Sequence, residues 1–316
     1  MCRNGQLPRR AAAGTGAGIT EAAFPVTPGG PPGVEVTSLA GFAALTDRWG
    51  GGVYAPLRPA FHLLITVRSG VLLCSVDLTA CAVGEGAWLW VRPGQVLTLA
   101  CDLAAAEGTA VLFQPGFLGA ATASAARLQR RAWRLPLTPA EPAAGQVRAT
   151  LEMLEREYRR LTDLPLEVHV EVVRHLLAVL VLRLAHLPGG PRREMAGGEI
   201  FHRFQQAVER DFTRSHRVED YARALGYCVR TLTRATGAAA GCGAKRFLDD
   251  RILLEAKRLL VHTDLSAAAV GERLGFPGAA VFTRFFRLRT RETPVAFRER
   301  ARGLEGEAPG SPKRGA

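Results

Sequence analysis

The spacing of hydrophobic positions changes between the first and the second part of the chain. From residue 34 to residue 113 they form short runs rich in branched and aromatic side chains, separated by turns that contain glycine. These runs cover residues 61–67, 71–76, 87–91, 96–99 and 110–113. Short, evenly spaced runs of this kind are typical of the strands of a small β-barrel or sandwich. We therefore expect strands throughout residues 34–113.

Helical spacing follows this segment. Apolar residues recur every three or four positions over residues 147–161 and again over residues 168–184, after Pro165. This spacing predicts two amphipathic helices, which could serve as a dimer interface; because dimers are the commonest oligomers, we expect a homodimer. Residues 188–199 are polar and rich in glycine and proline, which predicts a linker. Residues 1–32 and 304–316 are expected to be disordered tails.

Two similar helix-turn-helix patterns occupy the last third of the chain. In the second pattern, Ser266 is the expected N-cap of a short helix that Gly275 ends, and Phe276 is expected to pack back on that helix. A second helix follows, and a long helix over residues 244–261 joins the two patterns. The apolar residues expected on the inner face of that second helix are Val281, Phe282, Phe285 and Phe286.

The first pattern has the same order, with a short helix from Val218, a stop at Gly226 and a second helix from about Cys228. The second helix of such a pair enters the major groove of DNA. For one copy alone, an ordinary helical hairpin with a solvated basic face is an equal alternative, but two copies favour DNA binding. The expected DNA contacts are Arg230, Thr231, Thr233 and Arg234 in the first unit and Ala279, Ala280, Thr283, Arg284 and Arg287 in the second.

The distribution of charge agrees with DNA binding. The chain of 316 residues has 41 basic and 29 acidic residues, a formal net charge of +12. Residues 200–303 hold 20 basic and 11 acidic residues, whereas residues 33–187 hold 14 and 13. The surplus therefore lies with the two helix pairs, where the neutralisation of phosphates requires it.

Cysteine usage and apolar content favour a reduced, cytoplasmic protein. The six cysteines include no CxxC pair and no zinc-finger spacing, and neither a signal peptide nor a membrane span is expected. Cys74 and Cys81 could face each other across a hairpin, which raises the alternative of a thiol sensor.

The chain offers little that an enzyme would need. His62 is the single histidine of the candidate barrel, so we expect no bound metal, and no phosphate loop or nucleophile motif is present. Neither a catalytic residue nor a cofactor is therefore expected. Trp88 and Trp90 share one face of their strand, which suits a sugar or an aromatic ligand, or equally a core or dimer contact. The candidate residues for binding a small-molecule effector are His62, Trp88 and Trp90.

Residues 200–303 resemble the DNA-binding domain of the AraC/XylS family of bacterial transcription regulators. The positions that carry the resemblance are Gly226, Leu232 and Arg234, then Arg251, Ala256 and Leu259, and finally Gly275, Phe276, Phe282, Arg284, Phe286, Thr293, Pro294 and Phe297. Two positions depart from the family pattern: Thr236 replaces a bulky aromatic residue, which suggests looser packing, and Arg291 replaces a glycine. The resemblance implies that residues 33–187 form a cupin-like sensing and dimerisation domain.

The expected fold class is thus α+β, with a cupin-like β-barrel and two helices before an all-α DNA-binding domain. The expected function is a sequence-specific, ligand-responsive transcription regulator whose partners are double-stranded DNA, a small effector and RNA polymerase. The alternatives are a non-specific or architectural nucleic-acid-binding protein and a cupin-type enzyme with an appended DNA module.

Overall fold

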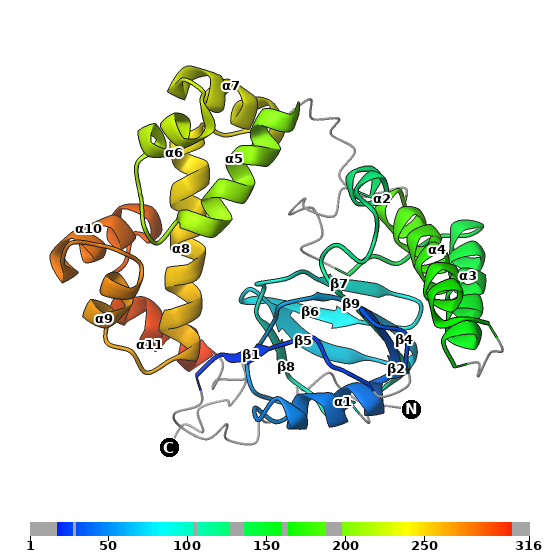
Figure 1. The fold of residues 1–316 in the computed structure, drawn as a ribbon. Helices are drawn as coiled ribbons and strands as arrows, with labels where there is room; N and C mark the ends of the chain where they lie inside the picture. Colours follow the sequence, from blue (N-terminus) through cyan, green and yellow to red (C-terminus); the bar gives the residue numbers. More distant parts are fainter. Residues whose placement is uncertain are drawn as a thin grey trace, which may run out of the picture. The chain divides into compact units, whose positions relative to one another are not determined.

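A computed structural model describes residues 18–27, 30–103, 106–126, 136–159, 164–187 and 198–304. They form two compact units, one within residues 10–192 and the other within residues 193–316 (Figure 1). Residues 188–197 of the expected linker lie outside the described residues, and residues 198 and 199 begin a helix. Parts of the two segments predicted to be disordered are ordered: strand β1 (Thr20–Ala22) lies within residues 1–32, and residue 304 is the last residue of a helix. Residues 1–17, 28, 29 and 305–316 lie outside the described residues.

Two sheets build the N-terminal unit. The five-stranded sheet has the order β1, β3 (Leu57–Pro59), β8 (Leu97–Leu99), β5 (Leu72–Val76) and β6 (Thr79–Val83). The four-stranded sheet has the order β2 (Val34–Ser38), β9 (Ala106–Phe113), β4 (His62–Gly70) and β7 (Trp88–Val91). All pairings are antiparallel except that of β1 with β3.

The four-stranded sheet is buried on both faces, which explains the continuous apolar run of β4. Leu63 and Ile65 point to a first core, shared with the five-stranded sheet. Leu64, between them, points to a second core on the opposite face. Successive side chains of a strand alternate between its faces, so a strand between two cores must be apolar at every position.

Helix α1 (Leu39–Arg48) corrects the expectation of strands throughout residues 34–113. The amide of Gly41 donates to Ser38 Oγ at 3.1 Å and so caps the helix. Leu39, Phe42 and Leu45 recur at helical spacing and enter the first core. Strand-like neighbours on either side conceal this helix in the sequence.

Three further helices follow the sheets: α2 (Ala120–Ala125), α3 (Ala143–Arg159) and α4 (Leu166–Ala185). Helices α3 and α4 are the two predicted amphipathic helices, and their inner faces form the second core with the outer face of the four-stranded sheet. Figure 1 shows them side by side. His169 Nε2 of α4 lies 2.9 Å from the carbonyl oxygen of Glu157 in α3, which ties the pair together.

The described residues of the C-terminal unit form helices joined by short connections. Its helices are α5 (Gly198–Asp211), α6 (Val218–Leu225), α7 (Val229–Ala240), α8 (Ala244–His262), α9 (Ala267–Arg273), α10 (Ala279–Thr290) and α11 (Pro294–Leu304). Helix α8 is the predicted joining helix, with α6 and α7 before it and α9 and α10 after it (Figure 1). An α+β fold with an all-α C-terminal domain is therefore confirmed.

Candidate nucleic-acid interface

The two helix-turn-helix units share one turn geometry. Gly226 and Gly275 have φ angles of 72° and 81°, the left-handed conformation that glycine adopts without steric cost. The amide after each glycine donates to the carbonyl five residues earlier, at 2.9 Å in the first unit and 3.0 Å in the second. This is the Schellman arrangement, which closes the first helix and lets the chain turn into the second.

Helix α10 has two fully buried aromatic rings: Phe282 packs against Gly271 of α9, and the ring centre of Phe286 lies 5.4 Å from that of Phe297 in α11. Phe282 and Phe286 have no exposed surface, and a Cβ on Gly271 would lie 2.8 Å from Phe282 Cβ, so only glycine fits on α9 there. The amide of Ala269 donates to Ser266 Oγ at 3.1 Å, which confirms the predicted N-cap. Val281 is a correction: 49% of it is exposed, on the outer side of α10 rather than in the core.

Helix α7 forms without the bulky aromatic residue of the family pattern. Thr236 takes that place and is fully buried, and its hydroxyl donates to the Leu232 carbonyl oxygen at 2.7 Å. The hydroxyl is thus satisfied inside its own helix, and Leu232 supplies the apolar contact of this face with no exposed surface.

The residues predicted to contact DNA lie on the outer surface of α7 and α10. Thr231 and Thr283 are half-buried at the edge of their helices. The exposed ones are Arg230, Thr233 and Arg234 on α7 and Ala279, Ala280, Arg284 and Arg287 on α10. Each set therefore shares one solvent-facing side of a helix that follows the turn.

Most arginines of the C-terminal unit are held by neighbouring groups. A carboxylate, a tyrosine hydroxyl or a backbone carbonyl contacts Arg203, Arg210, Arg214, Arg217, Arg223, Arg246, Arg251, Arg258, Arg289, Arg298, Arg300 and Arg302. Within the described part of the chain, the arginines of this unit without such a contact are Arg230, Arg234, Arg273, Arg284, Arg287 and Arg291. The arginines available to bind phosphate thus lie on α7, on α10, at the end of α9 and directly after α10.

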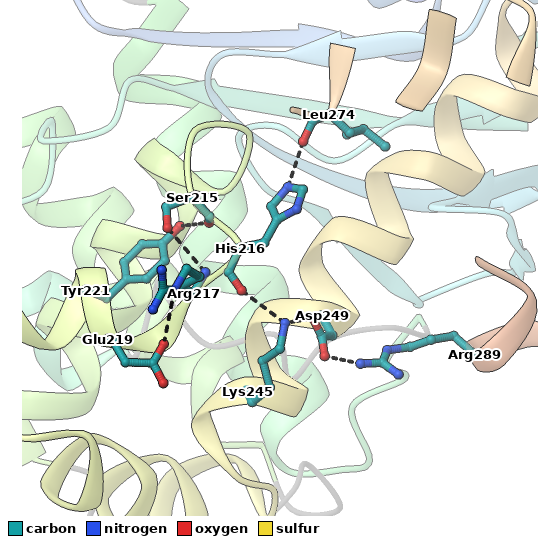
Figure 2. Close-up of polar contacts among 9 residues, drawn as sticks. All are labelled: Ser215, His216, Arg217, Glu219, Tyr221, Lys245, Asp249, Leu274 and Arg289. Carbon is teal, nitrogen blue, oxygen red and sulfur yellow. Dashed lines mark hydrogen bonds and ion pairs between the residues drawn. The ribbon is translucent and has the colours of Figure 1, made fainter. Parts of the chain in front are cut away.

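The two helix-turn-helix units are joined by polar contacts near the N-terminal end of α8 (Figure 2). His216 Nε2, from the segment before α6, lies 2.7 Å from the carbonyl oxygen of Leu274 in the second unit. Lys245 Nζ donates to the His216 carbonyl at 3.0 Å and pairs with Asp249 Oδ1 at 2.6 Å. Arg289 of α10 binds the other oxygen of the same carboxylate.

Burial governs the chemistry of this joint. The carboxylate of Asp249 is 1% exposed, so its two cationic partners supply the charge that a buried anion needs. Desolvation lowers the pKa of His216, which keeps its ring neutral at pH 7 with Nε2–H as the donor to Leu274. The joint therefore holds the segment before α6 and the N-terminal end of α8 against the second helix-turn-helix unit.

Arg251 of α8 is structural rather than a candidate for DNA contact. Its Nε donates to Glu209 at 2.6 Å, its Nη1 to Glu255 at 3.2 Å, and its guanidinium carbon lies 3.9 Å from the centre of the Phe212 ring. Glu209 lies on α5, so this contact docks α5 against α8.

The candidate effector residues do not face the interior between the two sheets. Trp88 pairs with Thr66 and Trp90 with Leu64, so both rings, like His62, lie on the side of the four-stranded sheet that α3 and α4 cover. His62 stacks on Phe113 with ring centres 4.7 Å apart and lies 6.0 Å from Trp90. The structure brings His62 and Trp90 together as part of the second core.

Arg92, which the sequence did not single out, lies beside this cluster. Its guanidinium carbon is 5.4 Å from the centre of the Trp90 ring. Arg92 Nε and Nη1 and His62 Nδ1 are buried and have no hydrogen-bond partner among the described residues. Burial, with a smaller contribution from Arg92, lowers the pKa of His62 to about 3, so the histidine is neutral at pH 7. Alternation along β7 places Arg92 on the face of Trp90, which is the signal that could have found it.

The described residues contain no cluster of three or more histidine, cysteine, aspartate or glutamate side chains that could hold a metal ion. Within the same residues, no helix is both long and apolar enough to cross a membrane.

Comparison with known proteins finds relatives of this chain among transcription regulators. A helix-turn-helix domain model matches residues 221–300. The transcriptional regulator ExsA of Pseudomonas aeruginosa is 24% identical over 166 residues, which are 50% of this chain and 59% of ExsA. The probable transcription factor PqrA of Proteus vulgaris is 32% identical over 83 residues, which are 26% of this chain and 68% of PqrA.

The structure of ToxT from Vibrio cholerae aligns with 84% of this chain and 98% of its own, with 9% identity and a TM-score of 0.38. The order of the two units, their glycine turns and the identity with PqrA agree with the family resemblance of residues 200–303. The chain belongs to the AraC/XylS family of helix-turn-helix transcription regulators.

Proposed function

We propose that this protein is a sequence-specific DNA-binding transcription regulator that reads adjacent major grooves with α7 and α10. One observation carries the proposal: of the six exposed arginines that lack an acidic or carbonyl partner within the described part of the C-terminal unit, four lie on these two helices. An unpaired guanidinium on a helix that follows such a turn can bind guanine or phosphate without first breaking an ion pair. A cytoplasmic location accords with this role.

In this proposal the two helices make different kinds of contact with DNA. Helix α7 offers Arg230 and Arg234, which donate hydrogen bonds at base edges, and Thr233, whose hydroxyl can donate or accept them. Helix α10 begins with Ala279 and Ala280, and the exposed Val281 follows, so its first turn suits the methyl group of thymine. Arg284 and Arg287 then serve mainly as phosphate contacts.

The test is selection of fragments from sheared genomic DNA by the full-length protein at near-physiological salt. We expect a few sites that share a motif, and we expect Arg230→Ala to weaken binding to them by about 1–3 kcal/mol. Arg223→Ala is the matched control, because Arg223 is exposed on α6 but pairs with Asp220 at 3.7 Å. Even recovery of all fragments, or equal losses for the two variants, would favour non-specific binding instead.

A salt titration separates phosphate contacts from base contacts. Arg287→Ala should weaken binding to all sequences alike and reduce the slope of log affinity against log salt by about 1. A change in sequence preference with this variant would assign Arg287 to base readout. Contact with RNA polymerase stays a prediction.

A homodimer through α4 is the second part of the proposal. Val168 and Val179 are 45% and 42% exposed on α4, and Leu166 at its start is 54% exposed. Paired copies of this helix would remove that apolar surface from water. We expect Val179→Glu to give a monomer by light scattering with weaker operator binding, whereas an unchanged mass would exclude α4 as the interface.

The effector, in this proposal, is a small organic anion that binds beside Arg92. A buried guanidinium with two unsatisfied nitrogens is costly unless an anion or water completes its hydrogen bonds. Because His62 is neutral at pH 7, the cluster carries one positive charge and suits a monoanion. Benzoate should raise the melting temperature more than neutral benzamide does, and Arg92→Gln should abolish the difference. Equal shifts with both compounds would refute the assignment.

A further inference from the structure

The hairpin of β5 and β6 carries two cysteines directly opposite each other. Asp77 and Leu78 form its turn, with φ angles of 51° and 67°, the pair of positive angles typical of a two-residue hairpin turn. This turn fixes the register, in which Cys74 pairs with Cys81. The two sulfur atoms lie 3.3 Å apart.

The two thiols differ in exposure and in acidity. Cys74 is 3% exposed and points into the first core, whereas Cys81 is half-buried on β6, the edge strand of the five-stranded sheet. Their hydrogen bond lowers the pKa of Cys81 and raises that of Cys74. Cys81 is thus the sulfur that ionises first, and Cys74 is the one that keeps its proton and donates.

We propose that Cys74 and Cys81 form a dithiol site that a hydroperoxide oxidises reversibly to a cross-strand disulfide. The site does not depend on the proposed DNA binding, because it rests on the geometry of the N-terminal unit alone. Directly opposed strand residues have Cα separations of about 4.5 or 5.5 Å, which lie within the range that a disulfide spans. The sulfur atoms need only close from 3.3 Å to about 2.05 Å.

The chemistry has two steps. The Cys81 thiolate attacks one oxygen of hydrogen peroxide, the O–O bond breaks, and hydroxide leaves, so that sulfur loses two electrons and becomes a sulfenic acid. Cys74 then attacks the Cys81 sulfur and forms the S–S bond, while the sulfenic hydroxyl leaves as water with the Cys74 proton. The hydroxide of the first step takes a proton from solvent, and a dithiol reductant reverses the reaction by exchange.

Cys101, in the same unit, is an alternative partner for Cys74, but the backbone of Leu73 contacts its sulfur. The amide of Leu73 donates to Cys101 Sγ at 3.1 Å, and this sulfur lies 3.7 Å from the Leu73 carbonyl oxygen. Cys228 is exposed at the start of α7 and reports on general oxidation of accessible thiols. Cys101→Ser and Cys228→Ser are therefore the matched controls.

The test uses the reduced full-length protein and near-stoichiometric hydrogen peroxide. After denaturation and alkylation of the remaining thiols, cleavage after Asp77, Glu85 and Asp102 places the three barrel cysteines on separate peptides. We expect the peptides that carry Cys74 and Cys81 to be recovered joined, with a mass lower by two hydrogen atoms, and dithiothreitol to separate them. This readout needs no substitution, so misfolded variants cannot obscure it.

The variants identify the order of events. In Cys74→Ser, Cys81 should stop at the sulfenic acid and be trapped by dimedone, whereas in Cys81→Ser the thiol of Cys74 should survive. Both control variants should still form the cross-link. The proposal is overturned if Cys228 is oxidised while the two peptides remain separate, or if Cys74 is recovered joined to Cys101.

Discussion

Alanine at Gly275 should destabilise the C-terminal unit far more than alanine at Gly226. Both glycines end the first helix of their unit with positive φ, so a side chain at either position costs about 1–2 kcal/mol in backbone energy. At Gly275 an added Cβ would also lie 1.9 Å from the carbonyl oxygen of Thr213, a contact that Cβ atoms essentially never make. At Gly226 an added Cβ meets no heavy atom within 4 Å.

Relief of the clash adds the cost of overpacking, about 1–3 kcal/mol. Gly275→Ala should therefore lose about 2–5 kcal/mol and Gly226→Ala about 1–2 kcal/mol. Denaturant unfolding of the full-length protein, followed by the far-UV circular dichroism signal of its helices, measures the loss of unfolding free energy in each variant. Thr213 precedes α6 of the first helix-turn-helix unit, and Gly275 lies in the second. Gly275→Ala should therefore also weaken the contacts between the two helix-turn-helix units and reduce the affinity for operator DNA. Equal losses of stability in the two variants would refute the close approach of Gly275 to Thr213.

Two further predictions concern stability. Arg291 ends α10 with a φ of 68°, so Arg291→Gly should stabilise the unit by about 1 kcal/mol in denaturant unfolding, whereas the same change at Arg287 inside the helix should destabilise it. The pKa of His62 is lowered to about 3 in the fold, so below pH 6.5 the unfolded chain binds a proton that the folded chain does not. Stability should thus fall as the pH is lowered from 6.5 towards 3, by up to about 1.4 kcal/mol per pH unit. His62→Gln should flatten this dependence of the melting temperature on pH, and an unchanged slope would assign it to other groups.

The sequence predicts the helix-turn-helix units well because their rules are local. A capping serine, a glycine stop and apolar residues at helical spacing lie within about one turn of the residues that they control. The prediction that Val281 lies on the inner face of α10 was wrong, since apolar character alone does not determine which side of a helix a residue occupies. Its neighbours Phe282 and Phe286 already fill the core.

The N-terminal unit is harder to read because its four-stranded sheet lies between two cores. All four residues of β7 are buried, so both of its faces are apolar, and the sequence shows that Trp88 and Trp90 share a face but not which core they enter. The helix α1 is hidden for a related reason, since its apolar spacing is short and its neighbours are strands. Tertiary packing, not local propensity, decides both cases.

Net charge is visible in the sequence, but the pairing of charges is not. Arg289 binds Asp249, a residue 40 positions earlier, whereas Arg287 on the same helix has no ionic partner in the part of the chain that the structure describes. Two neighbouring arginines of one basic helix thus have different roles, one in the joint between the units and one at the surface. Long-range contacts of this kind require the fold.

The joint and the length of α8 together set what the two recognition helices can read. Helix α8 has 19 residues, which corresponds to about 28 Å, and α7 and α10 lie with their units at its two ends. One turn of B-DNA is about 34 Å, and we expect a rigid α8 to hold the two helices so that they enter successive major grooves on one face of the duplex. The contacts of His216, Lys245 and Arg289 oppose bending of this arrangement. Sites whose two halves are moved to opposite faces of the duplex should therefore lose the contribution of one unit, because the protein cannot follow them without breaking the joint.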